Sequence, residues 1–388
     1  MNEGLFGIAY GAVLKAFRQR VKSGQGASQQ YSECVVLGTT DTTSPMSRST
    51  GAGAPAADVC DLVLQVPYAI GRYGQAVTAS GALSLQIPDG KITGGNRRGN
   101  GAVDLQTSRT AATQVASGPF AVVLGVDNTA SGGSLVTRVA AVSIGSGNNN
   151  AGSNSSLAIG VGNTLSNNSP AAFGGSNTVS CFEGLAIGFS NAVSGGGGAV
   201  GIGRSNTSSG SASVAVGISC TANASVAFSC GANSTARGIV SSYQWAGGQR
   251  TAVGDRQFRR LPHCATTSNA TATVLTTDGA AESTSNTWVI PANYSGILHG
   301  FVVARNTANN DTIGWEVKAM VTRDSTAASV AILGSASVAA VGTADAAMSS
   351  CSLAVGANTT NGSITLTATG IAATTIAWSG YIHCIENG

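Results

Sequence analysis

A short apolar motif that ends in glycine recurs along the middle of the chain, and the sequence around it repeats in phase. The anchoring apolar residue stands at positions 144, 159, 173, 187, 202, 216 and 228, in steps of 15, 14, 14, 15, 14 and 12 residues. A second apolar or small residue stands two positions before each anchor. Five motifs also have an asparagine four positions after it: Asn148, Asn163, Asn177, Asn191 and Asn206. Three columns in phase predict a chain that coils, with one repeat per coil.

Each coil is predicted to hold two short β-strands and two turns, because a period near 14 is too short for helical repeats. Side chains alternate along a strand, so Leu157 and Ile159 share one face while Ala158 and Gly160 share the other. We expect the bulky face to form the interior of the coil and the bare face to let a second copy approach closely. The asparagines are expected to form a hydrogen-bonded structural ladder along one corner of the stack.

Two bulky residues per coil make a thin core, which favours a parallel homotrimer over a monomeric solenoid. The repeats LAIG, AVGIG and VAVG, with GN or SN behind them, resemble the left-handed β-roll head of YadA-like trimeric adhesins. The resemblance covers residues 120–240 and implies a trimeric, left-handed, parallel β-roll that acts as a shaft. It implies no particular function.

The segments before the roll are predicted to attach the protein to a larger particle. Residues 94–118, GGNRRGNGAVDLQTSRTAATQVASG, resemble a segment of bacteriophage fibre proteins that leads into such a roll. Residues 31–119 then form a small β region for virion attachment, with short strands between glycine, proline and serine turns. Within residues 1–30, the apolar spacing and the basic residues that follow it predict an amphipathic anchoring helix over residues 5–22. That order of charges is the reverse of a secretion signal.

The segments after the roll change character. Residues 241–265 resemble the connector, or neck, that follows the roll in phage fibres, and Tyr243 and Trp245 are expected to cap the last coil. Residues 266–388 alternate as strands do: Trp315 and Val317 fall on one face and Glu316 on the other. The sequence TTNG predicts a hairpin turn. This segment resembles a C-terminal β-sandwich module of phage tail fibres. The fold class predicted for the whole chain is therefore an all-β, elongated homotrimer.

Composition narrows the choice of function. The 388 residues carry a net charge of +3, so no nucleic-acid partner is expected. The eight cysteines are scattered without a CxxC pair, which is typical of free cysteines from a reducing compartment. No apolar run is long enough to span a membrane as a helix.

The chemistry expected of an enzyme is missing from the sequence. The three histidines, His263, His299 and His383, have no partner at metal-binding spacing, and no catalytic motif appears. A depolymerase would need paired carboxylates along the roll, where Glu183 stands almost alone. We therefore expect no enzymatic activity, no cofactor and no metal.

A virion fibre, assembled in the host cytoplasm, is the function that the sequence favours. A trimeric autotransporter-like surface adhesin would need a secretion signal and a β-barrel anchor, and neither is recognised. A capsid fibre that decorates the head is the other alternative. The expected partners are other virion proteins (baseplate, tail tip or capsid) at the N-terminal part, and a host-surface polysaccharide or protein at the tip. The receptor-binding candidates are Arg305, Asn309, Asp311 and Tyr294, and the alternative interpretation is a solvated loop and a core tyrosine.

Overall fold

The computed structural model describes residues 5–8, 12–21, 30–39, 62–65, 83–84, 90–134, 139–152 and 155–388. Apart from two 3-10 helices, Ala327–Ser329 and Ala346–Met348, the regular structure of these residues is all strand. The chain forms two compact units, Met1–Asn177 and Thr178–Gly388. The predicted all-β fold class is confirmed.

The first unit begins with strands where the sequence predicted a helix. β1 (Leu5–Ile8), β2 (Ala12–Val21), β3 (Gln30–Thr39) and β4 (Leu62–Gln65) form an antiparallel sheet in that order. β2 pairs with β3 along its whole length, from Ala12 with Thr39 to Val21 with Gln30. Hydrogen bonds to a neighbouring strand take the place of those within a helix, because tertiary pairing readily overrides helix propensity. The other residues of the predicted 1–30 segment lie outside the described residues.

The coils of the first unit follow as parallel strands in register. The long strands pair in the order β5 (Leu83–Ser84), β6 (Val103–Ser108), β7 (Val122–Val126), β11 (Val142–Ser146), β13 (Leu157–Val161) and β15 (Ala171–Gly175). The short strands of the coils are β8 (Thr129–Ala130), β12 (Asn149–Asn150) and β14 (Thr164–Leu165). A small hairpin of β9 (Gly133–Ser134) and β10 (Val139–Ala140) projects from one coil.

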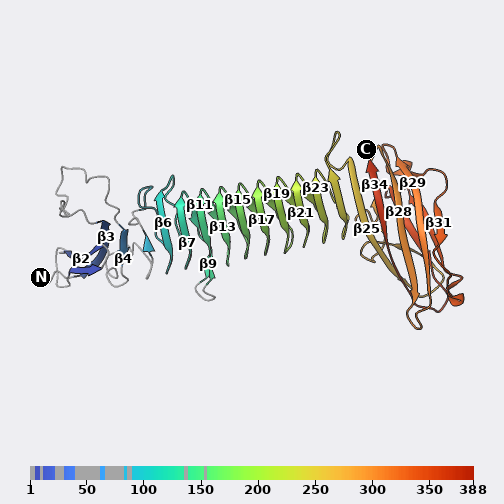
Figure 1. Ribbon diagram of the computed structural model, residues 1–388, viewed down its shortest axis with the longest axis horizontal. Helices are drawn as coiled ribbons and strands as arrows, with labels where there is room; N and C mark the ends of the chain where they lie inside the picture. The colour runs from blue at the N-terminus through green and yellow to red at the C-terminus, as the bar shows by residue number, and fades with distance from the viewer. Residues whose placement is uncertain are drawn as a thin grey trace. The chain divides into compact units, whose positions relative to one another are not determined.

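The second unit begins with coils of the same kind, which Figure 1 shows stacked side by side. Its long strands are β17 (Leu185–Phe189), β19 (Val200–Arg204), β21 (Val214–Ile218), β23 (Phe228–Ala232) and β24 (Tyr243–Gly247). Its short strands are β16 (Thr178–Val179), β18 (Ala192–Val193), β20 (Thr207–Ser208) and β22 (Thr221–Ala222). The predicted coiling is confirmed as a parallel β-solenoid with one motif per coil.

The two faces of the solenoid strand are the reverse of the expected ones. In β13, Ala158 is fully buried while Leu157 and Ile159 are half-buried on the outside and Val161 is 62% exposed. The interior of that coil is closed by Leu165 on the short strand β14, which is also fully buried. A coil of about 14 residues is too narrow for two bulky layers, so the small residues of the long strand turn inward. The bulky residues of the motif form an outer apolar face.

Buried asparagines connect successive coils. In the first unit the Asn163 amide donates to the Asn148 side-chain oxygen at 2.9 Å, and Asn177 donates to Asn163 at 3.0 Å. In the second unit Asn206 donates to Asn191 at 3.0 Å. Each of these five asparagines is at most 1% exposed. The hydrogen bonds expected of a ladder are thus present within each unit, and they satisfy backbone groups at the corner that would otherwise be buried without partners.

Glycine is required where the motif ends. Gly160 has a φ of +123°, and a Cβ there would collide with the backbone carbonyl oxygen of Gly174 in the next coil. Other residues rarely adopt this backbone conformation. The glycine column therefore reflects the close stacking of the coils.

Two packed sheets complete the second unit. The larger sheet has the order β25 (Arg256–Thr267), β34 (Ile376–Asn387), β28 (Tyr294–Asn306) and β29 (Thr312–Arg323), with β30 (Ala331–Ile332) and β31 (Ser337–Ala340) on the outer side of β29. In the smaller sheet β33 (Ser363–Thr369) pairs with β26 (Ala272–Leu275), β27 (Trp288–Val289) and β32 (Ser352–Asn358). The turn at TTNG joins β32 to β33, as predicted.

The inward faces of these sheets share one hydrophobic core. Trp315 and Val317 of β29 are buried, as the alternation predicted, and Trp315 stacks on Trp378 with ring centroids 5.5 Å apart. Trp288 and Leu275 of the smaller sheet belong to the same cluster. The arrangement is a two-layer β-sandwich.

The sandwich and the last coil share a sheet. β24 pairs antiparallel with β25, with Tyr243 opposite Arg260 and Trp245 opposite Phe258. Figure 1 shows β25 following the last coils into the sandwich. The side chains of Tyr243 and Trp245 stand on the outer face of this sheet, 40% and 50% exposed, so they do not cover the end of the last coil as predicted.

Candidate interaction surface

A single line of apolar side chains runs across the second unit, from the coils into the sandwich. Directly paired positions on consecutive strands place nine residues on one outer face: Ile187, Ile202, Val216, Cys230, Trp245, Phe258, Ile385, Ile297 and Met320. We call these nine residues the long apolar row. Cross-strand partners share a face of a sheet, so the row is continuous.

The long apolar row is widely exposed in a single chain. Ile187 is 39% exposed, Trp245 is 50% exposed and Ile385 is 60% exposed. In the neighbouring line on the same face, Phe228 stacks on Tyr243 with ring centroids 5.3 Å apart. A contiguous apolar surface of this kind marks an interaction site rather than scattered surface residues.

The smaller sheet of the sandwich contributes no exposed large apolar side chain among the described residues. Among the described residues, every large apolar side chain of the sandwich that is exposed comes from the larger sheet or from the segments along its β30–β31 edge: Ile297, Phe301, Val303, Met320, Leu333, Val341 and Ile385. The outward positions of β32, such as Ser352 and Ala354, are small or polar. The apolar surface is therefore confined to one side of the sandwich.

Beside the long apolar row lies a line of charged and titratable groups on the same face. Arg260, His383, His299 and Lys318 stand opposite one another on the four strands β25, β34, β28 and β29. We call them the basic row. Glu316 accepts from His299 Nε2 at 2.7 Å and from Lys318 Nζ at 2.9 Å. Both partners lower the pKa of Glu316, with Lys318 contributing most.

Aromatic rings surround His383. Its ring meets Tyr381 edge-on at 5.0 Å and lies 5.2 Å from Phe258, and the Arg260 guanidinium covers the Tyr381 ring at 4.4 Å. Burial lowers the pKa of His383, and the nearby charges of Arg260 and His299 lower it further. The surroundings of His383 therefore favour its neutral form.

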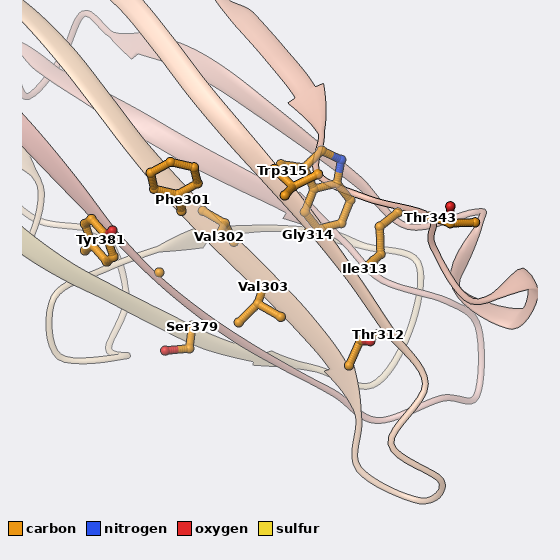
Figure 2. Close-up of a pocket in the computed structure, with 12 residues that line it drawn as sticks. Phe301, Val302, Val303, Thr312, Ile313, Gly314, Trp315, Thr343, Ser379 and Tyr381 are labelled. Carbon is orange, nitrogen blue, oxygen red and sulfur yellow. The ribbon is translucent and has the colours of Figure 1, made fainter.

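Two open hollows flank the basic row. One, of about 500 Å³, lies where Phe301, Val303 and Tyr381 meet the segment after β31, and Figure 2 shows the rings of Phe301 and Tyr381 side by side above Ser379 and Val303. The other, of about 480 Å³, is lined by Ile297, Met320 and Leu333. Both hollows are shallow openings in the same outer face.

The structure does not bring the four predicted receptor residues together. Arg305 lies at the end of β28, where its guanidinium donates to Asn310 at 2.6 Å, and Asn309 donates to Asp311 at 2.7 Å within the following loop. Tyr294 begins the same strand, eleven residues before Arg305. At about 3.3 Å per residue along a strand, the two residues are about 36 Å apart. The length of β28 therefore separates Tyr294 from the other three residues, although all four lie close together in the sequence.

Tyr294 is packed between the sandwich core and an arginine side chain. Its ring packs against the sandwich core, and the Arg237 guanidinium lies 4.9 Å from its centroid. Arg305, Asn309 and Asp311 form an exposed polar loop by themselves. The predicted four-residue site is thus divided into a loop and a packed tyrosine.

Other basic residues of the chain also have structural partners. Arg98 and Arg109 are both buried against the Asp104 carboxylate, at 2.6 and 3.2 Å. His263 is 2% exposed and bonds the Leu261 carbonyl at 3.1 Å, and burial lowers its pKa to about 4. These groups face the interior.

Sequence reasoning missed the outer face because it assigned the bulky residues to the interior. A signal was present: Val161, Phe189 and Ile218 continue the bulky face beyond the glycine of their motifs. Each of them ends its strand on the same alternating face as the bulky residues before the glycine, so that face carries more large side chains than the narrow interior can hold. In β34 and β28, apolar residues stand at both the inward and the outward positions, which was a second signal that the outer face is apolar.

Two features are absent from the residues that the structure describes. Within that part of the chain, no group of three or more His, Cys, Asp or Glu side chains is placed to hold a metal ion. No helix there is long and apolar enough to cross a membrane.

A comparison with protein-family models finds no match to this chain, and a search of curated proteins finds no similar sequence.

Proposed function

We propose that the chain is a structural virion fibre that works as a homotrimer, with the solenoid as its shaft and the sandwich as its receptor-binding tip. The observation that carries the proposal is the outer apolar face of the coils. On long strands such as β13 and β17 the small side chain faces inward, while the bulky side chains of the same motif face outward. Such a solenoid buries most of its apolar surface only when other copies cover it.

Three copies arranged around a common axis would each cover the bulky face of a neighbour. Fully burying a large apolar side chain stabilises by about 1.5 to 3 kcal/mol, so side chains that are already half-buried contribute about 1 kcal/mol each. Each coil supplies two or three such residues. Summed over the coils, these contributions are sufficient for a stable, rigid shaft.

The tip would contact a host-surface receptor, for which a glycan is the proposed class. The loop that holds Arg305, Asn309 and Asp311 is the candidate contact, because its polar groups are exposed at the end of a rigid strand. Tyr294 is left out because Arg237 and the core already pack against it. Three loops per fibre would turn a weak contact into useful avidity.

The N-terminal part would attach the fibre to the baseplate, the tail tip or the capsid. A tail fibre and a head fibre differ only in that attachment, and a bacterial surface adhesin would use the same shaft. The proposal assigns no catalytic step and no cofactor to the chain.

The first test is the mass of the intact chain by multi-angle light scattering. The expected value is near three times 38.2 kDa. The variant Ile202→Asp places a carboxylate in the part of the long apolar row that lies on the coils, and it should reduce the mass to that of one chain. Ala192→Asp is the matched control, because Ala192 is an exposed residue on the short strand β18 of a neighbouring coil. A folded wild-type monomer would overturn the proposal.

The receptor half is tested separately, with a glycan array and the full chain. Binding should be lost in the double variant Arg305→Ala/Asn309→Ala while the mass stays trimeric. Unchanged glycan binding in this variant would exclude the loop as the receptor contact.

A further inference from the structure

The outer face of the larger sandwich sheet continues the face proposed to hold the fibre together. β24 and β25 are paired strands, so Trp245 of the last coil and Phe258 of the sandwich stand side by side in the long apolar row. The row goes on without interruption through Ile385, Ile297 and Met320. Within the second unit, no described element lies over these three residues, which are 51% to 60% exposed.

We propose that this outer face of the β25–β34–β28–β29 sheet is covered by a second copy of the chain, and that protonation of His383 opens the contact. The inference rests on the proposed trimer, because copies joined along their coils bring the sandwich faces that extend the same row next to each other. The second copy therefore binds at a high effective concentration.

Apolar surface gives the contact its stability at neutral pH. Ile297, Met320 and Leu333 line one hollow, while Phe301, Val303 and Val341 line the other. Ridges and hollows of this size suit the packed core of a protein interface, which is rich in aromatic residues and methionine. The polar outward positions of the smaller sheet offer nothing comparable, so the two sides of the sandwich would have different environments in the fibre.

The basic row makes the contact sensitive to pH. His383 stands between Arg260 on β25 and His299 on β28, with Phe258 and Tyr381 beside it. On β29, Glu316 and Lys318 face His299.

Arg260 and Lys318 against Glu316 leave one net positive charge per copy beside His383, and protonation of His383 adds another. Like charges brought together in a contact that excludes water repel strongly, and histidine is the side chain that changes charge between pH 5 and 8. Its surroundings already lower the pKa of His383, and a covering copy would lower it further by excluding more water. Linkage then requires that protonation weaken the contact as pH falls.

Methionine oxidation provides a direct measurement of coverage on the full-length chain. Dilute hydrogen peroxide converts an accessible methionine to its sulfoxide, which peptide mass spectrometry locates. Met320 is 51% exposed in one copy and lies within the proposed contact beside Ile297, while Met348 is fully buried in the sandwich core. Met320 thus reports the contact, and Met348 reports whether the sandwich itself stays folded.

At pH 7.5 the Met320 oxidation rate should be at least about tenfold lower than in the variant Ile297→Asp, which places a charge in the contact. At pH 5.0 the wild-type rate should rise to that of the variant, while Met348 stays unreacted. The variant His383→Gln should keep Met320 protected at both pH values. Light scattering on the same samples gives the oligomeric state.

Each outcome distinguishes this inference from the proposed fibre. A trimeric mass with Met320 as reactive as in Ile297→Asp at pH 7.5 would overturn the sandwich contact and leave the fibre intact. Protection that persists at pH 5.0 would overturn the histidine switch. The same would follow if the variant His383→Gln still opened at pH 5.0. A monomeric mass would overturn both proposals.

Discussion

The Glu386 carboxylate holds the end of the chain to the connector that joins the coils to the sandwich, and its replacement by glutamine tests that connection. Glu386 is 2% exposed on β34. It contacts Arg237 at 2.6 Å and Arg259 at 3.3 Å, and it accepts from Trp288 Nε1 and Gln257 Nε2 at 2.8 Å each. These partners come from the last turn of the solenoid, from β25 and from the smaller sheet.

The magnitude follows from what the variant Glu386→Gln leaves behind. The Arg259 side chain is fully buried and also donates to the carbonyl oxygens of Thr235 and Ala236, so it cannot move to solvent without breaking those bonds. A buried charge that loses its partner costs about 3 to 5 kcal/mol. For a unit of about 200 residues, 1 kcal/mol shifts the melting temperature by about 2 to 4 °C. We therefore expect the transition of the second unit to fall by roughly 10 °C.

Differential scanning calorimetry of the full chain at pH 7 is the assay. Asp324→Asn is the matched control, because it neutralises an exposed carboxylate of the same sandwich, and it should shift the transition by about 2 °C or less. In Glu386→Gln/Arg259→Met the unpaired buried charge is gone, so part of the lost stability should return. A shift in Glu386→Gln no larger than the control would refute the reasoning.

The pH dependence gives a second check on the same residue. Burial alone would raise the pKa of Glu386, but Arg259, Arg237 and the hydrogen bonds from Trp288 and Gln257 outweigh it, so the pKa lies below its usual value. A carboxylate of this kind stabilises the folded state above its unfolded pKa near 4.5 and loses that contribution as pH falls. The melting temperature of wild type and Glu386→Gln should therefore converge as the solution is made more acidic.

Three further predictions concern single buried positions. His263 has a pKa of about 4 in the folded chain against 6.5 when unfolded, so its neutral form should contribute about 3 kcal/mol above pH 6.5 that is lost as pH falls toward 4, a loss that calorimetry should not find in His263→Gln. Asn163→Ala removes the two amide N–H donors that reach Asn148 Oδ1 and the carbonyl oxygens of Ile159 and Gly174, and it should destabilise the first unit by about 3 kcal/mol in urea unfolding. Gly160→Ala forces a Cβ onto the next coil and should lower the free energy of unfolding by more than about 3 kcal/mol. Gly162→Ala, at a φ of +64° and with its nearest Cβ contact at 3.9 Å, should lower it by only about 1 kcal/mol. Equal losses in the two variants would contradict the close stacking of the coils at Gly160.

Much of the fold could be predicted because its signals are local. The phased columns predicted the coil, the asparagines predicted the ladder contacts, and the alternation around Trp315 predicted the buried face of β29. The N-terminal strand Ala12–Val21 could not be predicted, since its pairing with Gln30–Thr39 depends on a partner rather than on its own periodicity. Alternation also predicts that the two faces of a strand differ, but it does not predict which face is buried. Only the width of a closed coil decides that Ala158 faces inward.

The candidate surface was beyond local prediction for a related reason. The long apolar row takes one residue from each of nine strands, and its order in space, from Phe258 to Ile385 and back to Ile297, is not the order of the chain. β34 lies between β25 and β28 although more than a hundred residues separate it from β25. Register alone places His383 beside His299 and Arg260. A slip of one residue in β34 would turn Ile385 and His383 into the core and bring Cys384 to the surface. The long apolar row and the basic row therefore depend on the same register of β34. The peroxide experiment on Met320 tests both.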